Sequence, residues 1–339
     1  MSFIELAWLF YGYTHNLQKR ALVKLVLKRE QSMIKDENIV YHYCSADVFT
    51  KIISGKKIRL SDITKSNDSM EILWIKEYIK EIFDEEFDKE TSNTKYFNEG
   101  YPKDAFSELV EHYSDDFFKA DQRIYSYMVC CFSKKGDLLS QWRGYADDAS
   151  GFSIGFDANA LATFGKPPAD DPISSDIFDF NKIIYDVREQ KARIRDCAKY
   201  LISELKPLSK MTGGHIKQQS MTAFNSCFLQ LFKWSIFMKN PFFKEEKEWR
   251  ICYCTDLRSN YKSSNIKIEG GLTLSDVAYY SRKNDVIPYV DLSFDKSVNN
   301  IIKIIVIGPK CRSSQKEIEV YMKNYGIVCN VVKSEGTYR

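Results

Sequence analysis

The sequence predicts an α+β fold, with a central mixed or antiparallel sheet and helical insertions. Short runs of β-branched and aromatic residues recur along the chain between turn residues, a pattern typical of strands. Two long stretches, near residues 71–123 and 188–240, instead show the spacing of amphipathic helices. The chain has no internal repeat and no low-complexity linker. We therefore expect an N-terminal helical segment over residues 1–37 and a single domain over residues 38–339 that contains both insertions.

The bulk composition argues against several classes of protein. The 339 residues are 44% hydrophobic and 14% aromatic, which is enough for a folded core. Lys and Arg number 49 against 46 Asp and Glu, and the net charge of +3 is small for a dedicated nucleic-acid coat or membrane-surface protein. The nine cysteines form no C-x-x-C pair and the four histidines are far apart, so we expect no metal site and no disulfide scaffold. We expect a cytoplasmic protein without a membrane span.

The N-terminal segment is expected to be helical over residues 3–30. Its apolar stripe consists of Phe3, Ala7, Trp8 and Tyr11. This stripe is expected to pack on the body of the protein or on a second subunit, and the second alternative would give a homo-oligomer through the N-terminal helix. Basic residues follow between positions 19 and 29. A solvated face is the simpler explanation of these charges, and contact with an anionic partner is the second one.

The domain is expected to begin with a strand over residues 39–44 that carries His42 and Tyr43. Ser45 can cap the helix that follows, because a short polar side chain accepts hydrogen bonds from the first free amides. A lone histidine on a strand is more often a structural residue than a functional one. The setting of His42, between two tyrosines and just before a capped helix, makes it a candidate binding residue.

A second short strand over residues 58–61 is expected to carry Arg59. Asn67 and Asp68 follow in a polar turn that leads into the next helix. A helix N-cap accounts for Asn67 and Asp68 about as well as a role in substrate binding does. We expect Arg59, Asn67 and Asp68 to line the rim of the cleft that holds the site.

Aromatic residues and glycines alternate in the middle of the chain. Residues 125–132 and 151–157 predict strands, and the glycines of the second one mark places where backbone or ligand approaches closely. Trp142 and Tyr145 lie between the two strands. Rings in such a position are usually part of the core, although a ring beside a glycine-rich strand can also stack on a flat ligand such as nicotinamide.

Glu248 stands at the start of a strand that runs from Trp249, and three glutamates in four residues precede that strand. A carboxylate at the mouth of a buried strand is held by the sheet and loses part of its hydration, which suits catalysis. An exposed glutamate before a strand is, however, usually without special function. The Glu245-x-Lys247 pattern also occurs in metal nucleases, but no strand precedes it here.

Three elements are expected to complete the chain. Residues 301–307 form a continuous apolar, β-branched run, which predicts a buried strand. A helix is expected from residue 314 to residue 325, and a last strand over residues 327–332.

Several segments together resemble a bacterial family known as domain of unknown function 2971. The segments that carry the resemblance are Tyr41 to Ser45, Leu60 to Glu71, Cys131 to Ser133, Trp142 with Tyr145, Gly151 to Phe156, Glu245 to Arg250, and Ile304 to Gly308. The resemblance covers about residues 38–335. Each segment is weak alone, but the set is specific. The family name implies no activity.

The order of elements is also similar to the ADP-ribosyltransferase fold, above all to its His-Tyr-Glu type and to members that modify DNA or RNA. In those enzymes a histidine binds the adenosine ribose, an aromatic ring stacks on nicotinamide, and a glutamate binds the 2′-hydroxyl of the nicotinamide ribose. The resemblance implies that His42, Tyr145 and Glu248 take these roles, with NAD as co-substrate and Glu248 as the catalytic residue. With the candidates named above, the expected cofactor-binding set is His42, Tyr43, Arg59, Asn67, Asp68, Trp142 and Tyr145.

The function that this resemblance implies is an NAD-consuming transferase or hydrolase, a toxin-type or antiviral defence effector that modifies an acceptor such as nucleic acid or protein. Loss of nicotinamide leaves an oxocarbenium-like sugar, which a fixed carboxylate stabilises. His42 and Glu248 are then expected on neighbouring central strands that face one cleft. The alternative is a non-catalytic binding module, or a nuclease-like effector of a bacterial defence system, in which the motif residues only build the fold.

Overall fold

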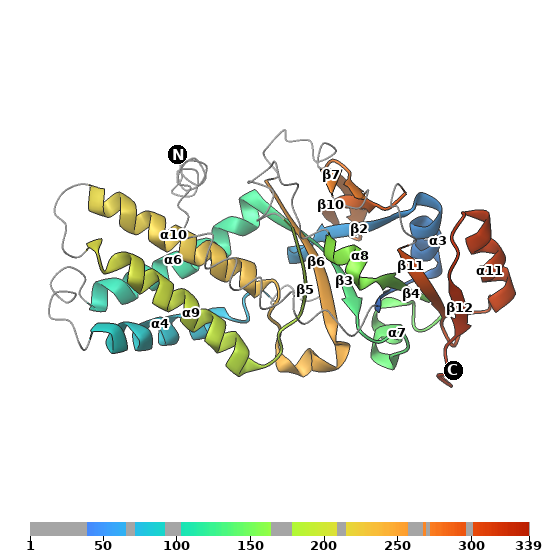
Figure 1. Ribbon diagram of the computed structural model, residues 1–339, viewed down its shortest axis with the longest axis horizontal. Helices are drawn as coiled ribbons and strands as arrows, with labels where there is room; N and C mark the ends of the chain where they lie inside the picture. Colours follow the sequence, from blue (N-terminus) through green and yellow to red (C-terminus); the bar gives the residue numbers. More distant parts are fainter. Residues whose placement is uncertain are drawn as a thin grey trace. The chain divides into compact units, whose positions relative to one another are not determined.

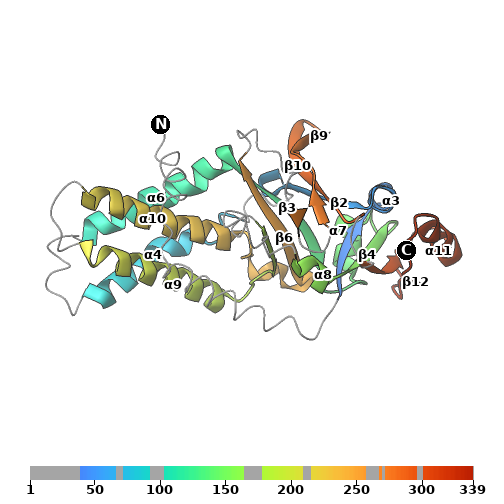
Figure 2. The same ribbon diagram turned by 45° about the horizontal axis from the view of Figure 1, so that its top comes forward.

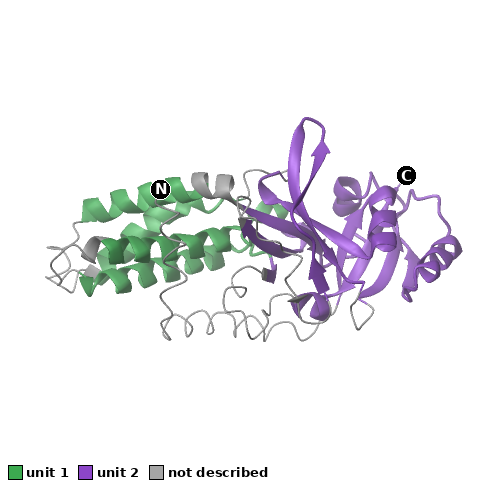
Figure 3. Ribbon diagram, turned by 90° about the horizontal axis from the view of Figure 1, so that it is seen from above, with its two compact units in different colours: residues 1–16, 67–124, 183–243 green, residues 17–66, 125–182, 244–339 purple. Residues whose placement is uncertain are grey.

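The computed structural model describes residues 39–65, 72–91, 103–163, 178–208, 215–256, 267–268, 272–295 and 301–338. The N-terminal segment expected over residues 1–37 lies outside this part of the chain. The described residues fall into two compact units (Figure 3). A helical unit comes from residues within 67–124 and 183–243, and the other described residues form a sheet unit (Figure 1).

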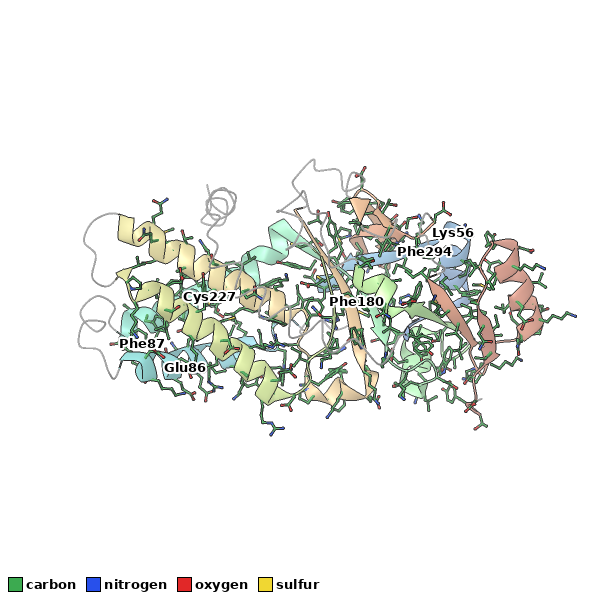
Figure 4. All side chains as sticks on the ribbon, viewed as in Figure 1. Lys56, Glu86, Phe87, Phe180, Cys227 and Phe294 are labelled. Atoms are coloured by element: carbon green, nitrogen blue, oxygen red, sulfur yellow. The ribbon has the colours of Figure 1, made fainter. Side chains whose placement is uncertain are left out.

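The helical unit contains α4 (Lys76–Thr91), α6 (Lys103–Ile124), α9 (Val187–Leu205) and α10 (His215–Ser235). These helices lie in the stretches where the sequence predicts insertions. Aromatic rings fill the space between them: Phe87 stacks on Phe106 at 4.5 Å between ring centroids, and Tyr113 stacks on Phe224 at 4.8 Å. Figure 4 labels Phe87 together with Cys227, which is also buried in this unit. The apolar stripes of the helices therefore supply the core of the unit.

One acid of α4 is buried inside the helical unit. Glu86 is buried, and its Oε1 accepts hydrogen bonds from Lys89 Nζ at 2.8 Å and from Arg195 Nε at 3.0 Å. Burial alone would raise the pKa of Glu86, but the neighbouring cations outweigh it and hold that pKa below its usual range. Glu86 thus ties α4 to α9 inside the helical unit.

The sheet unit is built on a 12-stranded sheet. The strands are β1 (Ile39–Cys44), β2 (Lys57–Asp62), β3 (Tyr125–Ser133), β4 (Phe152–Asp157), β5 (Phe178–Lys182), β6 (Glu248–Asp256), β7 (Lys267–Ile268), β8 (Leu272–Leu274), β9 (Ala278–Arg282), β10 (Asp285–Ser293), β11 (Ile302–Ile307) and β12 (Asn330–Lys333). The main path is β12-β11-β4-β1-β3-β2-β10-β8-β7, with β6 joined to β3, β5 to β6 and β9 to β10. Only β11 and β12 pair in parallel among the described pairs. The mixed sheet and the mixed α and β content expected from the sequence are confirmed.

Strand β3 is the branch point of the sheet. Along one edge it pairs with β6 over its whole length, from Tyr125 opposite Asp256 to Ser133 opposite Glu248. Its other edge is shared, because β1 pairs with it at Ser133 and β2 pairs with it at residues 128–129. β3 therefore separates β1 from β6.

The sheet has two different faces, because successive side chains of a strand point to opposite sides. The face called here the apolar face carries Val40, Ile154 and Ile251, in a core that also contains residues of α3 (Ala46–Gly55), α8 (Ala158–Ala162) and α11 (Gln315–Asn324). Phe180 and Phe294, labelled in Figure 4, belong to this core. The face called here the α7 face carries Tyr43 and Val306, packed with Trp142 of α7 (Leu139–Tyr145).

Helix α3 begins as the sequence predicts. The Ser45 side chain accepts a hydrogen bond from the Val48 amide at 3.3 Å, so the predicted cap is confirmed. The helix ends at Gly55 and is capped by Lys56, which has a left-handed backbone (φ 46°) and whose amide bonds the carbonyls of Ile52 and Ile53.

The glycines around β4 allow protein atoms to approach closely. A Cβ on Gly151 would lie 2.1 Å from the carbonyl oxygen of Cys44, and one on Gly155 would lie 2.4 Å from Cγ2 of Ile304. A Cβ on Gly308 would lie 2.5 Å from the carbonyl oxygen of Ala149. Of the two explanations that the sequence left open, close approach of the backbone and close approach of a ligand, packing within the protein accounts for these glycines.

Three consecutive residues after α7, Asp147, Asp148 and Ala149, have left-handed backbone with φ of 49°, 47° and 74°. Non-glycine residues in this region cost free energy, so the surrounding structure must hold them. The Ala149 amide bonds the Trp142 carbonyl at 3.0 Å, and the Ala149 carbonyl accepts from the Lys310 amide at 3.0 Å. These bonds fix the link between α7 and β4.

Candidate functional site

His42 and Glu248 lie on opposite faces of the sheet. Tyr41 pairs with Ser133, and Ser133 pairs with Glu248, so these three side chains share one face. His42 follows Tyr41 directly and therefore points to the other face, where its ring meets Phe132 at 5.9 Å between centroids. The prediction that His42 and Glu248 occupy neighbouring strands and face one cleft is wrong, because β3 separates their strands and the two-residue period of a strand separates their side chains.

Glu248 forms an ion pair with Arg250 on the same strand. Arg250 Nε donates to Glu248 Oε1 at 2.5 Å, and Arg250 Nη2 donates to Glu248 Oε2 at 3.0 Å. Residues two apart on a strand share a face, which brings the two side chains together. Both are buried, with only 6% of Glu248 and 2% of Arg250 exposed. The geometry is the bidentate one that guanidinium and carboxylate groups favour.

This pairing bears on the chemistry expected of Glu248. Stabilising an oxocarbenium-like sugar requires a carboxylate whose negative charge acts on the reacting carbon. Here both carboxylate oxygens already accept hydrogen bonds from a cation. The Arg250 guanidinium would also repel positive charge that develops nearby. The arrangement suits a structural pair better than a catalytic base or electrostatic stabiliser.

His42 bridges two strands where they separate. Past the Tyr41–Ser133 pair, His42 Nδ1 donates to the Cys131 carbonyl oxygen at 3.0 Å. Because a carbonyl oxygen can only accept, Nδ1 carries the proton. Burial lowers the pKa of His42, and the hydrogen bond to Cys131 offsets this only in part. His42 thus acts as a neutral hydrogen-bond donor between β1 and β3.

Tyr43 and Trp142 are brought together, but inside the protein. Their rings meet edge to face at 4.8 Å between centroids, and both side chains are buried. Trp142 Nε1 donates to Asp137 Oδ1 at 2.6 Å. The Tyr43 hydroxyl donates to the Lys135 carbonyl at 2.7 Å and accepts from the Leu138 amide at 2.9 Å. Burial also raises the pKa of the Tyr43 phenol. The core explanation of these rings fits better than stacking on nicotinamide.

The remaining expected residues are dispersed. Tyr145 ends α7 and 47% of it is exposed, while Asn67 and Asp68 lie outside the described residues. Arg59 is on β2, on the same face as Ser61 two residues further on, and Ser61 pairs with Val129 of β3. Val129 and Ser133 lie on one face of β3, and Ser133 pairs with Glu248, so Arg59 shares the α7 face with Glu248. Of the described residues in the expected set, Arg59 and Tyr145 are the ones with well-exposed side chains.

Arg59 is held by groups from β9 and β10. Its guanidinium carbon lies 3.6 Å from the ring centroid of Tyr289 and 5.3 Å from that of Tyr280. The two rings contact each other at 65° between their planes, with centroids 5.6 Å apart. Arg59 Nε donates to Asp291 Oδ1 at 3.1 Å, and Asp291 lies directly opposite Arg59 in the β2–β10 ladder. One flat face and one nitrogen of the guanidinium are therefore fixed.

The rest of the guanidinium is partly exposed among the described residues. The side chain of Arg59 is 42% exposed, and no described residue bonds its two terminal nitrogens. Asp291, only 8% exposed at its side chain, also pairs with Lys57 Nζ at 2.6 Å. This corner thus carries two cations against one buried carboxylate. A planar fork of N–H donors with a fixed orientation is the group that proteins use to bind phosphate and carboxylate.

Sequence reasoning missed the partners that define these environments. Arg250 could have been found from the Glu-x-Arg spacing on a strand, which places both side chains on one face. Asp291, Tyr289 and Tyr280 had no such signal. They lie more than 200 positions from Arg59, and only the strand pairing brings them to it.

Two general observations apply to the described residues. No group of three or more His, Cys, Asp or Glu side chains among them is arranged to hold a metal ion. None of the helices in this part of the chain has the length and apolar character needed to cross a membrane.

Comparison with known proteins gives one match. The family model described as "Protein of unknown function (DUF2971)" matches residues 141–251, which supports the resemblance to that family over this stretch. The matched stretch runs from α7 to the Glu248–Arg250 pair and Ile251. No curated protein and no solved structure matches the chain.

Proposed function

We propose that the sheet unit is a non-catalytic binding module whose ligand carries a phosphate or carboxylate group held by Arg59. The observation that carries this proposal is that the Arg59 guanidinium is held in a fixed orientation while its terminal nitrogens have no bonding partner among the described residues. Tyr289 and Asp291 fix its orientation, and its terminal nitrogens have no partner among the described residues. A donor group that is already ordered loses little side-chain entropy when a ligand binds.

In this proposal, the residues that were expected to carry out NAD chemistry have a structural role instead. Glu248 is neutralised by Arg250, His42 lies on the other face of the sheet, and Tyr43 and Trp142 are buried with their polar atoms bonded. An NAD-consuming enzyme would need several of these groups to meet around one substrate. The motif residues instead secure the strands and the α7 segment.

Anion binding is tested by thermal unfolding of the full chain with inorganic phosphate as the probe. Phosphate is expected to raise the melting temperature of the wild type, because a ligand that binds only the folded state stabilises it. The Arg59→Gln variant should lose this increase. Lys51→Gln is the matched control, since Lys51 is an exposed lysine on α3. Equal increases in all three proteins would contradict the proposal.

Release of nicotinamide from NAD tests the enzyme directly. Wild type, Glu248→Gln and Glu245→Gln are compared, because Glu245 is an exposed glutamate three residues before Glu248. No release above the buffer rate is expected from any of them. Release by the wild type and by Glu245→Gln, but not by Glu248→Gln at a temperature where its melting curve shows that it is folded, would restore the catalytic role of Glu248 and overturn the binding-module proposal.

A further inference from the structure

The α7 face of β2, β9 and β10 carries a row of basic and aromatic side chains beyond Arg59. The row, called here the basic–aromatic stripe, consists of Lys57, Arg59, Tyr289, Tyr280 and Arg282. The pairings that align it are Asp291 with Arg59, Tyr289 with Ser61, and Ile287 with Tyr280. Figure 2 shows β2, β10 and the β9–β10 hairpin side by side, and the hairpin gives the stripe its far end.

The charges of the stripe lie at both ends of a long strand. Lys57 is beside Ser293, and Arg282 is beside Asp285, so they mark the two ends of the nine-residue strand β10. At the usual rise per residue this separation is about 27 Å. Lys65 joins the far end, where its carbonyl accepts a hydrogen bond from Arg282 and its Nζ pairs with Asp285. Among the described residues, the four cations Lys57, Arg59, Lys65 and Arg282 therefore meet two carboxylates, Asp285 and Asp291.

The rings lie between the charges. Tyr280 and Tyr289 are both partly exposed, and they form a corner around the Arg59 guanidinium. Flat aromatic surface beside a line of cations is the combination that binds single strands of nucleic acid, because bases stack on rings while phosphates meet the basic groups. The length of the stripe exceeds that of one nucleotide, which favours a chain of nucleotides over a single one.

We infer that the basic–aromatic stripe binds single-stranded nucleic acid, with a phosphate on the terminal nitrogens of Arg59 and a base against Tyr280. This inference rests on the proposed binding module and names its ligand. No bond forms or breaks in it. The small net charge of the whole chain is compatible with it, because a local basic stripe does not require a large net charge.

The test is fluorescence anisotropy of the full chain with a labelled single-stranded oligonucleotide of eight nucleotides. We expect Arg59→Lys to bind about tenfold more weakly, since lysine keeps the charge but loses the planar fork. Tyr280→Leu should also lose about tenfold, the range typical of one base–aromatic stack. Arg59→Gln should lower the slope of log affinity against log salt by about 0.7, the value for one phosphate contact on a single strand.

Controls separate the stripe from general charge and from misfolding. Lys51→Gln removes one positive charge from α3, whose apolar residues pack on the other face, and should bind within about twofold of wild type. Melting curves identify any variant that fails to fold. Arg282→Gln then serves as a second probe, because Arg282 is exposed at the hairpin end and lies outside the Arg59 corner.

The inference is overturned by any of four results: no binding of the oligonucleotide by the wild type, full affinity in Arg59→Lys, equal affinity for a duplex, or equal affinity for adenosine monophosphate. The phosphate and NAD measurements then show whether the nucleic-acid inference alone has failed or the proposed binding module has failed with it. If phosphate binding depends on Arg59 but the oligonucleotide does not bind, nucleic acid is rejected as the ligand and the proposed binding module still stands. If NAD is consumed and this consumption depends on Glu248, both the nucleic-acid inference and the binding-module proposal are rejected.

Discussion

Arg250 donates two hydrogen bonds to Glu248 from two residues further along the same strand, at 2.5 Å and 3.0 Å, and both side chains are buried. The pair stands where the end of β3 meets the start of β6, with Ser133 opposite Glu248. Ser133 reinforces this junction, because its hydroxyl donates to the Glu246 carbonyl at 2.7 Å. Glu248 is thus part of the framework that holds the centre of the sheet together.

Replacing Glu248 by Gln should destabilise the protein strongly. Gln keeps the size of the side chain but removes the negative charge that Glu248 sets against the buried Arg250 guanidinium, and breaking a buried ion pair from one side typically costs about 3–5 kcal/mol. Urea unfolding measures the change in the free energy of unfolding. Glu245→Gln changes an exposed glutamate and should stay within about 0.5 kcal/mol of wild type. A Glu248→Gln protein as stable as wild type would show that the pair does not support the fold.

The double variant Glu248→Leu with Arg250→Met separates the charge from the packing. Replacing both members of a buried ion pair by apolar residues of similar size removes the cost of an unpaired charge. We expect it to be more stable than Glu248→Gln. A double variant less stable than the single one would show that the two side chains have further essential partners.

His42 should make the protein less stable as the pH falls through about 6.5. Burial lowers the pKa of His42 in the folded state, so the unfolded chain, whose histidine has a pKa of about 6.5, binds the proton first. The stability contribution of neutral His42 is therefore complete above this pH and declines below it. Urea unfolding between about pH 8 and about pH 5 should show a smaller loss for His42→Gln, which can still donate to the Cys131 carbonyl but does not titrate. Identical pH profiles would contradict this assignment.

Gly151→Ala should destabilise the sheet unit, whereas Gly144→Ala should not. A Cβ on Gly151 would lie 2.1 Å from the Cys44 carbonyl oxygen and 3.0 Å from that of Ala146, and backbone atoms cannot move aside cheaply. We expect a loss of about 3 kcal/mol or more in thermal or urea unfolding. A Cβ on Gly144 meets no atom within 4 Å, and Gly144 is in α7. There Ala should leave stability unchanged or raise it by up to about 1 kcal/mol. Equal effects of the two changes would refute the packing explanation.

Tyr43→Phe should lower stability by about 1–3 kcal/mol. It removes the hydroxyl that donates to the Lys135 carbonyl and accepts from the Leu138 amide, and so leaves polar backbone groups without this partner. Tyr279→Phe is the control, since 57% of Tyr279 is exposed, and it should change stability by less than about 0.5 kcal/mol. If Tyr43→Phe weakens NAD binding while its stability equals that of wild type, the cofactor role expected from the sequence is the better one.

Much of the local structure can be predicted from the sequence because its causes are local. The β-branched and aromatic runs give β1, β3, β4, β6 and β11 close to their expected bounds. Ser45 identifies the start of α3 because a cap bonds amides only three residues away. The helical stretches near 71–123 and 188–240 follow from apolar spacing within each helix. The residues that approach a glycine cannot be found in this way, and Ile304 lies beside Gly155 only because β11 pairs with β4.

The sequence by itself determined several of the strands and helices, and that the protein combines a mixed sheet with helical stretches. Only the tertiary structure decided which side chains meet. Strand β3 lies between β1 and β6, and its Ser133 pairs with both Tyr41 and Glu248, so Tyr41 and Glu248 share one face. Adjacent residues of a strand point to opposite faces, and His42, which follows Tyr41, therefore lies on the other face. The same long-range pairing brings Tyr289 and Asp291 to Arg59. The register between strands that are distant in sequence is set by the packing of the whole core. A single segment of sequence does not contain the information about that packing.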